Sequence, residues 1–202
     1  MIPTAAQLPP PYEDDALARL AKLADIAEGE IGTAERPPGS NSGPRVEIYQ
    51  AVCSLASSQP TGWPWCAAFV CWCVGQLIAR QPGLLALRIE ANPPREASVY
   101  GLEDWARRTG LPFSDDNDNP ITPRRGDLVF YKFSHVEIVR AVYADHFETI
   151  GGNTEAQGKT WAESDGGEVA IRVRSFHIAR CFARLVPRAL PAPVSVVTRA
   201  NG

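Results

Sequence analysis

The sequence predicts an α+β fold in which N-terminal helices pack on a C-terminal antiparallel β-sheet. Up to about residue 110, apolar residues recur at helical spacing, and segment 64–80 is apolar on nearly all sides. After Pro123 the pattern changes to short β-type runs separated by turn residues. Helices that come first and strands that come second are typical of the α+β class.

Four helices are expected in order along the chain. The first covers 13–31, where apolar residues follow the helical period. The second starts at Pro44, a residue that suits the first helical position, and runs to about Ser57. The third, 64–80, lacks a polar face and is therefore expected to be central and buried. A shorter fourth helix is expected over 97–108.

Five strands are expected after the helices: 127–133, 135–143, 147–150, 168–175 and 179–186. The second and third are typical of a hairpin. With a three-residue loop over 143–145, Val142 pairs with His146, and the same register places His135 opposite Asn153. A two-residue loop would shift the pairing by one residue, a slip that the glycines at 151 and 152 could absorb as a bulge.

The length of 202 residues suits one compact domain with a hydrophobic core. We expect the folded domain over 13–186, with a disordered proline-rich arm over 1–12 and a flexible C-terminal tail over 187–202.

Charge and hydropathy exclude several classes of function. A net charge of −3 argues against a nucleic-acid binder that relies on a broad basic surface. No apolar run is long enough to span a bilayer, so membrane insertion is not expected. The N-terminus lacks the basic start and apolar middle of a secretory signal, so we expect synthesis in the cytoplasm without such a signal.

The cysteines include one candidate nucleophile. None of the five belongs to a C-x-x-C pair, which favours free thiols over a structural zinc site. Cys66 follows Pro64 and Trp65 at the start of the expected buried helix, where unpaired amides and the helix dipole favour a thiolate. Cys71 and Cys73 fall deeper in that helix, where burial would leave them inert. A cysteine at a helix start is more often a packing residue, so it needs partners.

His135 and Asn153 are the expected partners of Cys66. If they face each other across the hairpin, the asparagine can hold the imidazole in one tautomer. Cysteine, histidine and an orienting amide are the parts of a cysteine acyl-transfer site. The alternative is an edge histidine and a turn asparagine without catalytic roles. The residues alone leave both interpretations open.

Three motifs resemble the CHAP family, within the wider NlpC/P60 group of papain-like amidases and peptidases. They are Pro-Trp-Cys-Ala-Ala-Phe-Val at 64–70, His-Val-Glu-Ile-Val at 135–139 and Gly-Gly-Asn-Thr at 151–154. The Gly/Ser/Asn loop at 39–44 resembles a subgroup found in phage lysins. The resemblance covers roughly residues 15–186, and its most specific part is Pro-Trp-Cys.

The resemblance implies a papain-like fold with Cys66 as nucleophile, His135 as base and Asn153 as orienting residue. Many family members carry a glutamate two positions before the asparagine, a place that Gly151 occupies here. A catalytic set of three residues is therefore expected. Glu148 lies too far along the strand to substitute.

Candidates for substrate contact are Trp63, Trp65 and Trp161, together with Ser134 beside the histidine. Aromatic residues near a helix start are, however, more often part of a core. The acidic loop at 115–119 lacks the glycine and glutamate positions of an EF-hand, so no metal or other cofactor is expected.

The family implies cleavage of peptidoglycan, either at the N-acetylmuramoyl–L-alanine amide or within the stem peptide. We expect a monomer that acts in the cell wall or periplasm after delivery. A holin, a phage tail or a secretion machine are candidate delivery partners. A phage or prophage lysin is the first interpretation, and an injected antibacterial amidase effector is the second. A catalytically silent wall-binding virion component and an enzyme acting on protein amides are the alternatives from other classes.

Overall fold

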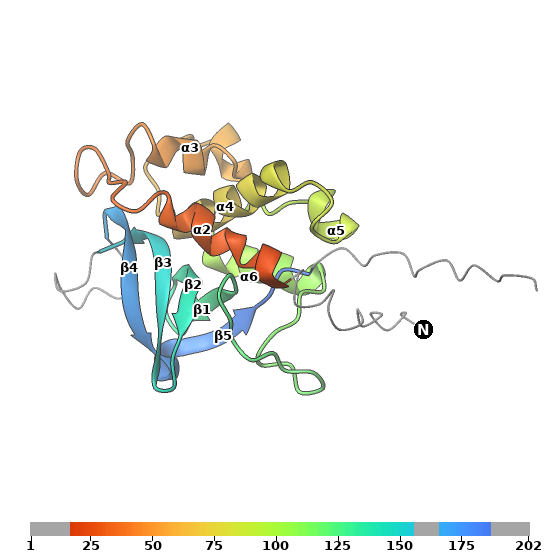
Figure 1. Ribbon diagram of the computed structural model, residues 1–202. Helices are drawn as coiled ribbons and strands as arrows, with labels where there is room; N and C mark the ends of the chain where they lie inside the picture. The colour runs from red at the N-terminus through yellow and green to blue at the C-terminus, as the bar shows by residue number, and fades with distance from the viewer. Residues whose placement is uncertain (1–16, 156–165, 187–202) are drawn as a thin grey trace, which may run out of the picture.

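The computed structural model describes residues 17–155 and 166–186, which form helices packed on one antiparallel sheet (Figure 1). The sheet has five strands in the order β4-β3-β2-β1-β5. Two helices, α2 (Lys22–Glu28) and α4 (Cys66–Arg80), contact the central strands β2 and β3. The predicted α+β class, with helices before strands, is confirmed.

The other helices before β1 are shorter than α4. They are α3 (Val46–Gln50), the 3₁₀ helix η1 (Ser54–Ser57), α5 (Leu87–Glu90) and α6 (Val99–Arg108). The expected helix over 44–57 is wrong in its length, because Cys53 is extended and its thiol donates to the Glu96 carbonyl at 3.3 Å. The Ser54 amide bonds to Arg95, so a neighbouring loop takes the hydrogen bonds that a continuing helix would use.

All five predicted strands are present among the described residues. They are β1 (Leu128–Tyr131), β2 (Val136–Val142), β3 (His146–Thr154), β4 (Glu168–Ser175) and β5 (Ala179–Ala183). The third is longer than predicted because it continues through Gly151 and Gly152 to Thr154. A Cβ atom at Gly152 would lie 2.5 Å from Trp65, so this glycine permits close packing of α4 on the sheet.

The three-residue hairpin loop is wrong, and the pairing next to the turn is that of the two-residue alternative, shifted by one residue. Val142 pairs with Phe147 rather than with His146, and the Tyr143 amide donates to the His146 carbonyl at 2.9 Å. A bulge between Val139 and Ala141 then shifts the pairing by one residue, so that Ile138 faces Ile150 as the predicted register requires. The pairing of β2 with β3 extends as far as Ile138 and Ile150, so it does not reach the expected pair of His135 and Asn153.

The core lies between α4 and the sheet. Ten of the fifteen residues of α4 are buried, in agreement with the absence of a polar face in the sequence. Tyr49 of α3 joins this core and contacts the rings of Trp65, Phe69 and Trp72, with centroids 5.2–5.7 Å apart. Burying a large apolar side chain such as Phe69 stabilises the fold by about 1.5–3 kcal/mol.

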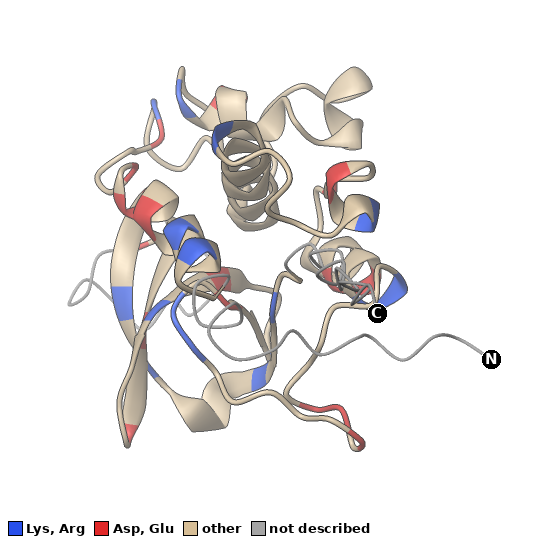
Figure 2. Ribbon diagram, turned by 45° about the vertical axis from the view of Figure 1, so that its right-hand side comes forward, with Lys and Arg blue, Asp and Glu red and all other residues tan. Residues whose placement is uncertain are grey.

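The structure does not describe residues 1–16 and 187–202. The expected arm over 1–12, the first four residues of the expected domain and the tail over 187–202 therefore lie outside the described residues. Within the described part of the chain, no helix is long and apolar enough to cross a membrane. In the view of Figure 2, acidic and basic positions alternate over the helices and strands instead of separating into two faces.

Alanine substitutions at two glycines test the packing of α4, because they should change the free energy of unfolding in opposite directions. Gly152→Ala is expected to destabilise the protein by about 1–3 kcal/mol, because the new methyl overlaps Trp65 and Phe69. Gly75→Ala in α4 meets nothing within 4 Å and should stabilise by about 0.5–1 kcal/mol. Urea unfolding measures both changes. Equal stabilities of the two variants would contradict the proposed close approach of α4 and β3.

Candidate active site

Cys66 is the first residue of α4, with Trp65 as the preceding cap residue. Its side chain is nearly buried, and it lies among the first amides of a fifteen-residue helix, which have no partner within the helix. These amides and the helix dipole favour negative charge. The indole of Trp65 donates to Glu35 at 2.9 Å, which fastens the start of the helix to the loop before α3.

His135 lies directly before β2, at the end of the tight connection from β1. Its carbonyl accepts from the Tyr131 amide at 3.2 Å and its amide donates to Phe133 at 2.8 Å. The imidazole is fully buried and stacks on the rings of Tyr131 and Phe133, at centroid distances of 5.9 and 6.3 Å. The short connection and the two rings together fix the orientation of the histidine.

The two ring nitrogens of His135 have different surroundings. Nε2 lies 3.1 Å from Oε1 of Glu137. Because an ionised carboxylate can only accept, Nε2 carries a proton in this pair. Nδ1 is buried and makes no hydrogen bond with a described residue. This nitrogen is available to exchange a proton with Cys66, whose thiol is close enough to affect the pKa of the ring.

Charge at the site favours an imidazolium. Burial lowers the pKa of His135, but the neighbouring Cys66 and Glu137 outweigh it and raise the pKa to about 9. Burial also raises the pKa of Glu137, yet His135 and Arg174 hold it well below its usual range. At neutral pH the site therefore contains a charged carboxylate and a charged imidazole.

The carboxylate of Glu137 receives hydrogen bonds from three further strands. Tyr131 of β1 donates to it, Thr149 of β3 donates at 2.5 Å, and Arg174 of β4 donates from two nitrogens at 2.7 and 3.1 Å. All four side chains are buried. Glu137 was not among the residues predicted for the site, although a charged residue inside the apolar run at 135–139, two positions after the histidine, was a usable signal.

The other predicted site residues lie as follows. Asn153 is buried at the end of β3 with a positive φ of 55°. Ser134 is exposed next to His135. Trp63 and Trp65 are buried in the core, so their rings offer little surface to a substrate. Trp161 lies outside the described residues.

Three of the other four thiols have raised pKa values. Burial raises the pKa of Cys71 and Cys73 well above the usual value, and raises that of Cys181 to about 12. Cys53 and Cys71 both contact the carbonyl of Glu96, at 3.3 and 3.5 Å. These contacts agree with a packing role for the cysteines other than Cys66.

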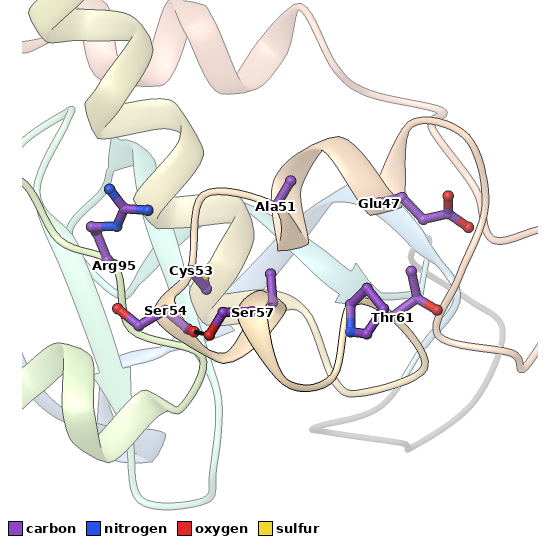
Figure 3. A pocket seen from close by; sticks show the side chains of 9 residues that line it. Glu47, Ala51, Cys53, Ser54, Ser57, Thr61 and Arg95 are labelled. Carbon is purple, nitrogen blue, oxygen red and sulfur yellow. Dashed lines mark hydrogen bonds between the residues drawn. The ribbon is translucent and has the colours of Figure 1, made fainter.

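A surface hollow lies away from Cys66 and His135. It measures about 680 Å³ between α3, η1 and Arg95, and Figure 3 shows Glu47, Ser54 and Thr61 along it. None of the described residues that line it is a histidine. In the described parts of the chain, no group of three or more histidine, cysteine or carboxylate side chains is placed to hold a metal ion.

Thiol alkylation tests whether Cys66 differs from the other cysteines. With iodoacetamide at pH 7.5, Cys66 is expected to react at least about ten times faster than Cys71 or Cys73, because thiolates alkylate and burial keeps the other two protonated. Peptide mass spectrometry measures each rate. His135→Gln, which keeps the exposure of Cys66, should remove most of the difference. Equal rates in the wild type would contradict an activated Cys66.

Comparisons with known proteins extend this description. Neither the comparison with curated proteins nor that with solved structures gave a match. The family model of the CHAP domain matches residues 58–153, a segment that contains Cys66, His135 and Glu137 and that ends at Asn153.

Proposed function

We propose that this protein is a cysteine hydrolase that cleaves amide bonds of bacterial peptidoglycan through a thioester intermediate. The observation that carries the proposal is the position of His135, buried between the Glu137 carboxylate and the Cys66 thiol at the start of α4. Acyl transfer requires a base that is hydrogen-bonded to an orienting carboxylate on one side and lies next to a nucleophile on the other.

In the proposed first step, the Cys66 thiolate attacks the amide carbonyl, whose oxygen becomes an oxyanion. The unpaired amides of the first turn of α4 stabilise this charge. The intermediate collapses as the His135 imidazolium gives its proton to the departing amine. The products of this half-reaction are a free amine, a thioester on Cys66 and a neutral imidazole.

In the second step, neutral His135 takes a proton from water while the water oxygen attacks the thioester carbonyl. Collapse of that intermediate expels the Cys66 thiolate and releases the acid product. The starting thiolate and imidazolium are thereby restored. General acid–base transfer of this kind contributes about 10²–10⁴-fold to the rate.

Asn153 is proposed as a further orienting residue of the site. It is buried near the end of β3, the strand that pairs with β2 directly after His135. Residues 13–186 are proposed as the catalytic domain, since the matched segment and the sheet both lie within that range.

The CHAP match supports peptidoglycan as the substrate, with the muramoyl–L-alanine amide or a stem-peptide bond as the site of cleavage. We propose a phage or prophage lysin. An injected antibacterial effector would use the same chemistry.

Digestion of purified sacculi tests the proposed reaction. Wild-type protein should release soluble fragments, whereas Cys66→Ser should release none, because the hydroxyl is not ionised near neutral pH. Mass spectrometry of the fragments identifies the bond that is cut. A folded, reduced wild type that releases no more than the serine variant would contradict the proposal and favour a silent binding module.

The pH dependence of kcat/KM is a second test. The pKa of His135 is raised from its ordinary value of 6.5 to about 9, so the imidazolium persists through neutral pH. Activity should therefore fall as the pH rises through about 9. Initial rates of fragment release between about pH 6 and pH 10.5 measure this limb. A loss of activity near the ordinary histidine pKa of about 6.5 would contradict the charge state described for the site.

A further inference from the structure

Gly151 lies beside the side chain of Glu137 on the adjacent strand. A Cβ atom at position 151 would lie 2.6 Å from Cγ and 2.8 Å from Oε1 of Glu137. Since real Cβ atoms do not approach so closely, no larger residue fits at 151 while Glu137 holds its present position. The carboxyl carbon of Glu137 lies 3.0 Å from that Cβ position, within reach of a glutamate side chain rooted at 151.

We propose that Glu137 is the positioning residue for His135, and that Glu137 and Gly151 form an exchangeable pair in which either strand can supply the carboxylate. This inference rests on the proposed function for its effect on turnover. It adds Glu137 to the three expected site residues, since this carboxylate from β2 occupies the space that a side chain at 151 would need.

The site is built to hold a charged carboxylate at this place. Arg174 donates from two nitrogens to Glu137 and is itself 4% exposed, so its charge compensates the carboxylate inside the fold. Tyr131 and Thr149 donate to the same carboxylate. Tyr131, Thr149 and Arg174 would all keep their positions if residue 151 were changed. They would therefore remain available as donors to a glutamate at position 151 of β3.

If Glu137 positions His135, its removal changes the pH at which the imidazole titrates, which a purely structural role would not do. The charged and titratable groups around the imidazole are Cys66 of α4, Glu137 of β2, Tyr131 of β1 and, through the carboxylate, Arg174 of β4. Among these, Cys66 and Glu137 favour the imidazolium. Removal of the Glu137 charge should therefore lower the pH at which the imidazolium is lost.

The experiment compares wild type with Glu137→Gln, Glu137→Gly and the double variant E137G/G151E. The first readout is kcat/KM on sacculi as a function of pH. The second is the pH dependence of Cys66 alkylation by iodoacetamide, which needs no substrate. Glu148→Gln is the matched control, because Glu148 lies on the same hairpin but pairs with Arg140.

Both single changes at 137 should lower kcat/KM by about 100-fold or more. They should also move the fall of kcat/KM at high pH to a lower pH. The double variant should recover kcat/KM to within about tenfold of wild type, and its kcat/KM should fall at the same high pH as that of the wild type. Glu148→Gln should match wild type. Circular dichroism and urea unfolding identify variants that fail to fold, and Glu137→Gln, which conserves size, serves where Glu137→Gly is unfolded.

Two results would overturn the inference. One is a folded Glu137→Gln that retains wild-type kcat/KM and the wild-type alkylation profile. The other is a folded E137G/G151E that regains neither activity nor the alkylation profile. If wild type itself leaves sacculi intact, the proposed function fails. The alkylation profiles then still decide whether Glu137 controls the charge of His135.

Discussion

The buried carboxylate of Glu137 is the group on which the geometry of the site depends. It bonds to side chains of β1, β3 and β4 and to the histidine that precedes its own strand, so one charge links four strands to the proposed base. An unpaired carboxylate would be too costly at this depth, and Arg174 offsets that cost. The hydrogen bonds of Glu137 that join the strands therefore also hold the imidazole of His135 in its orientation.

The second constraint is the close packing of α4 on β3. Gly152 lets Trp65 and Phe69 approach the strand, and Cys66 lies between these two positions at the start of the helix. The indole of Trp65 also holds Glu35, which limits movement of the helix start. The two adjacent glycines of β3 thus have separate roles, since Gly152 leaves room for the helix that carries the proposed nucleophile and Gly151 leaves room for the carboxylate beside the proposed base.

Much of this arrangement could be predicted from the sequence because it rests on local patterns. The all-round apolar character of 64–80 predicted the buried α4, and the β-type runs predicted all five strands of the described sheet. The role of Glu137 could not be derived in the same way, since its partners Thr149 and Arg174 come from strands whose register depends on a bulge. The end of α3 was also missed, because contacts of Cys53 with a distant loop decide it.

The protonation state of His135 is the property that tests this account most directly. Nitrogen NMR of the imidazole in 15N-labelled protein distinguishes the two charge states, and there are only three histidines to assign. The account predicts an imidazolium at pH 7.5 that becomes neutral as the pH rises through about 9, and a lower transition in Cys66→Ala, where the thiol is absent. A neutral His135 at pH 7.5 in the wild type, unchanged by loss of Cys66, would contradict it.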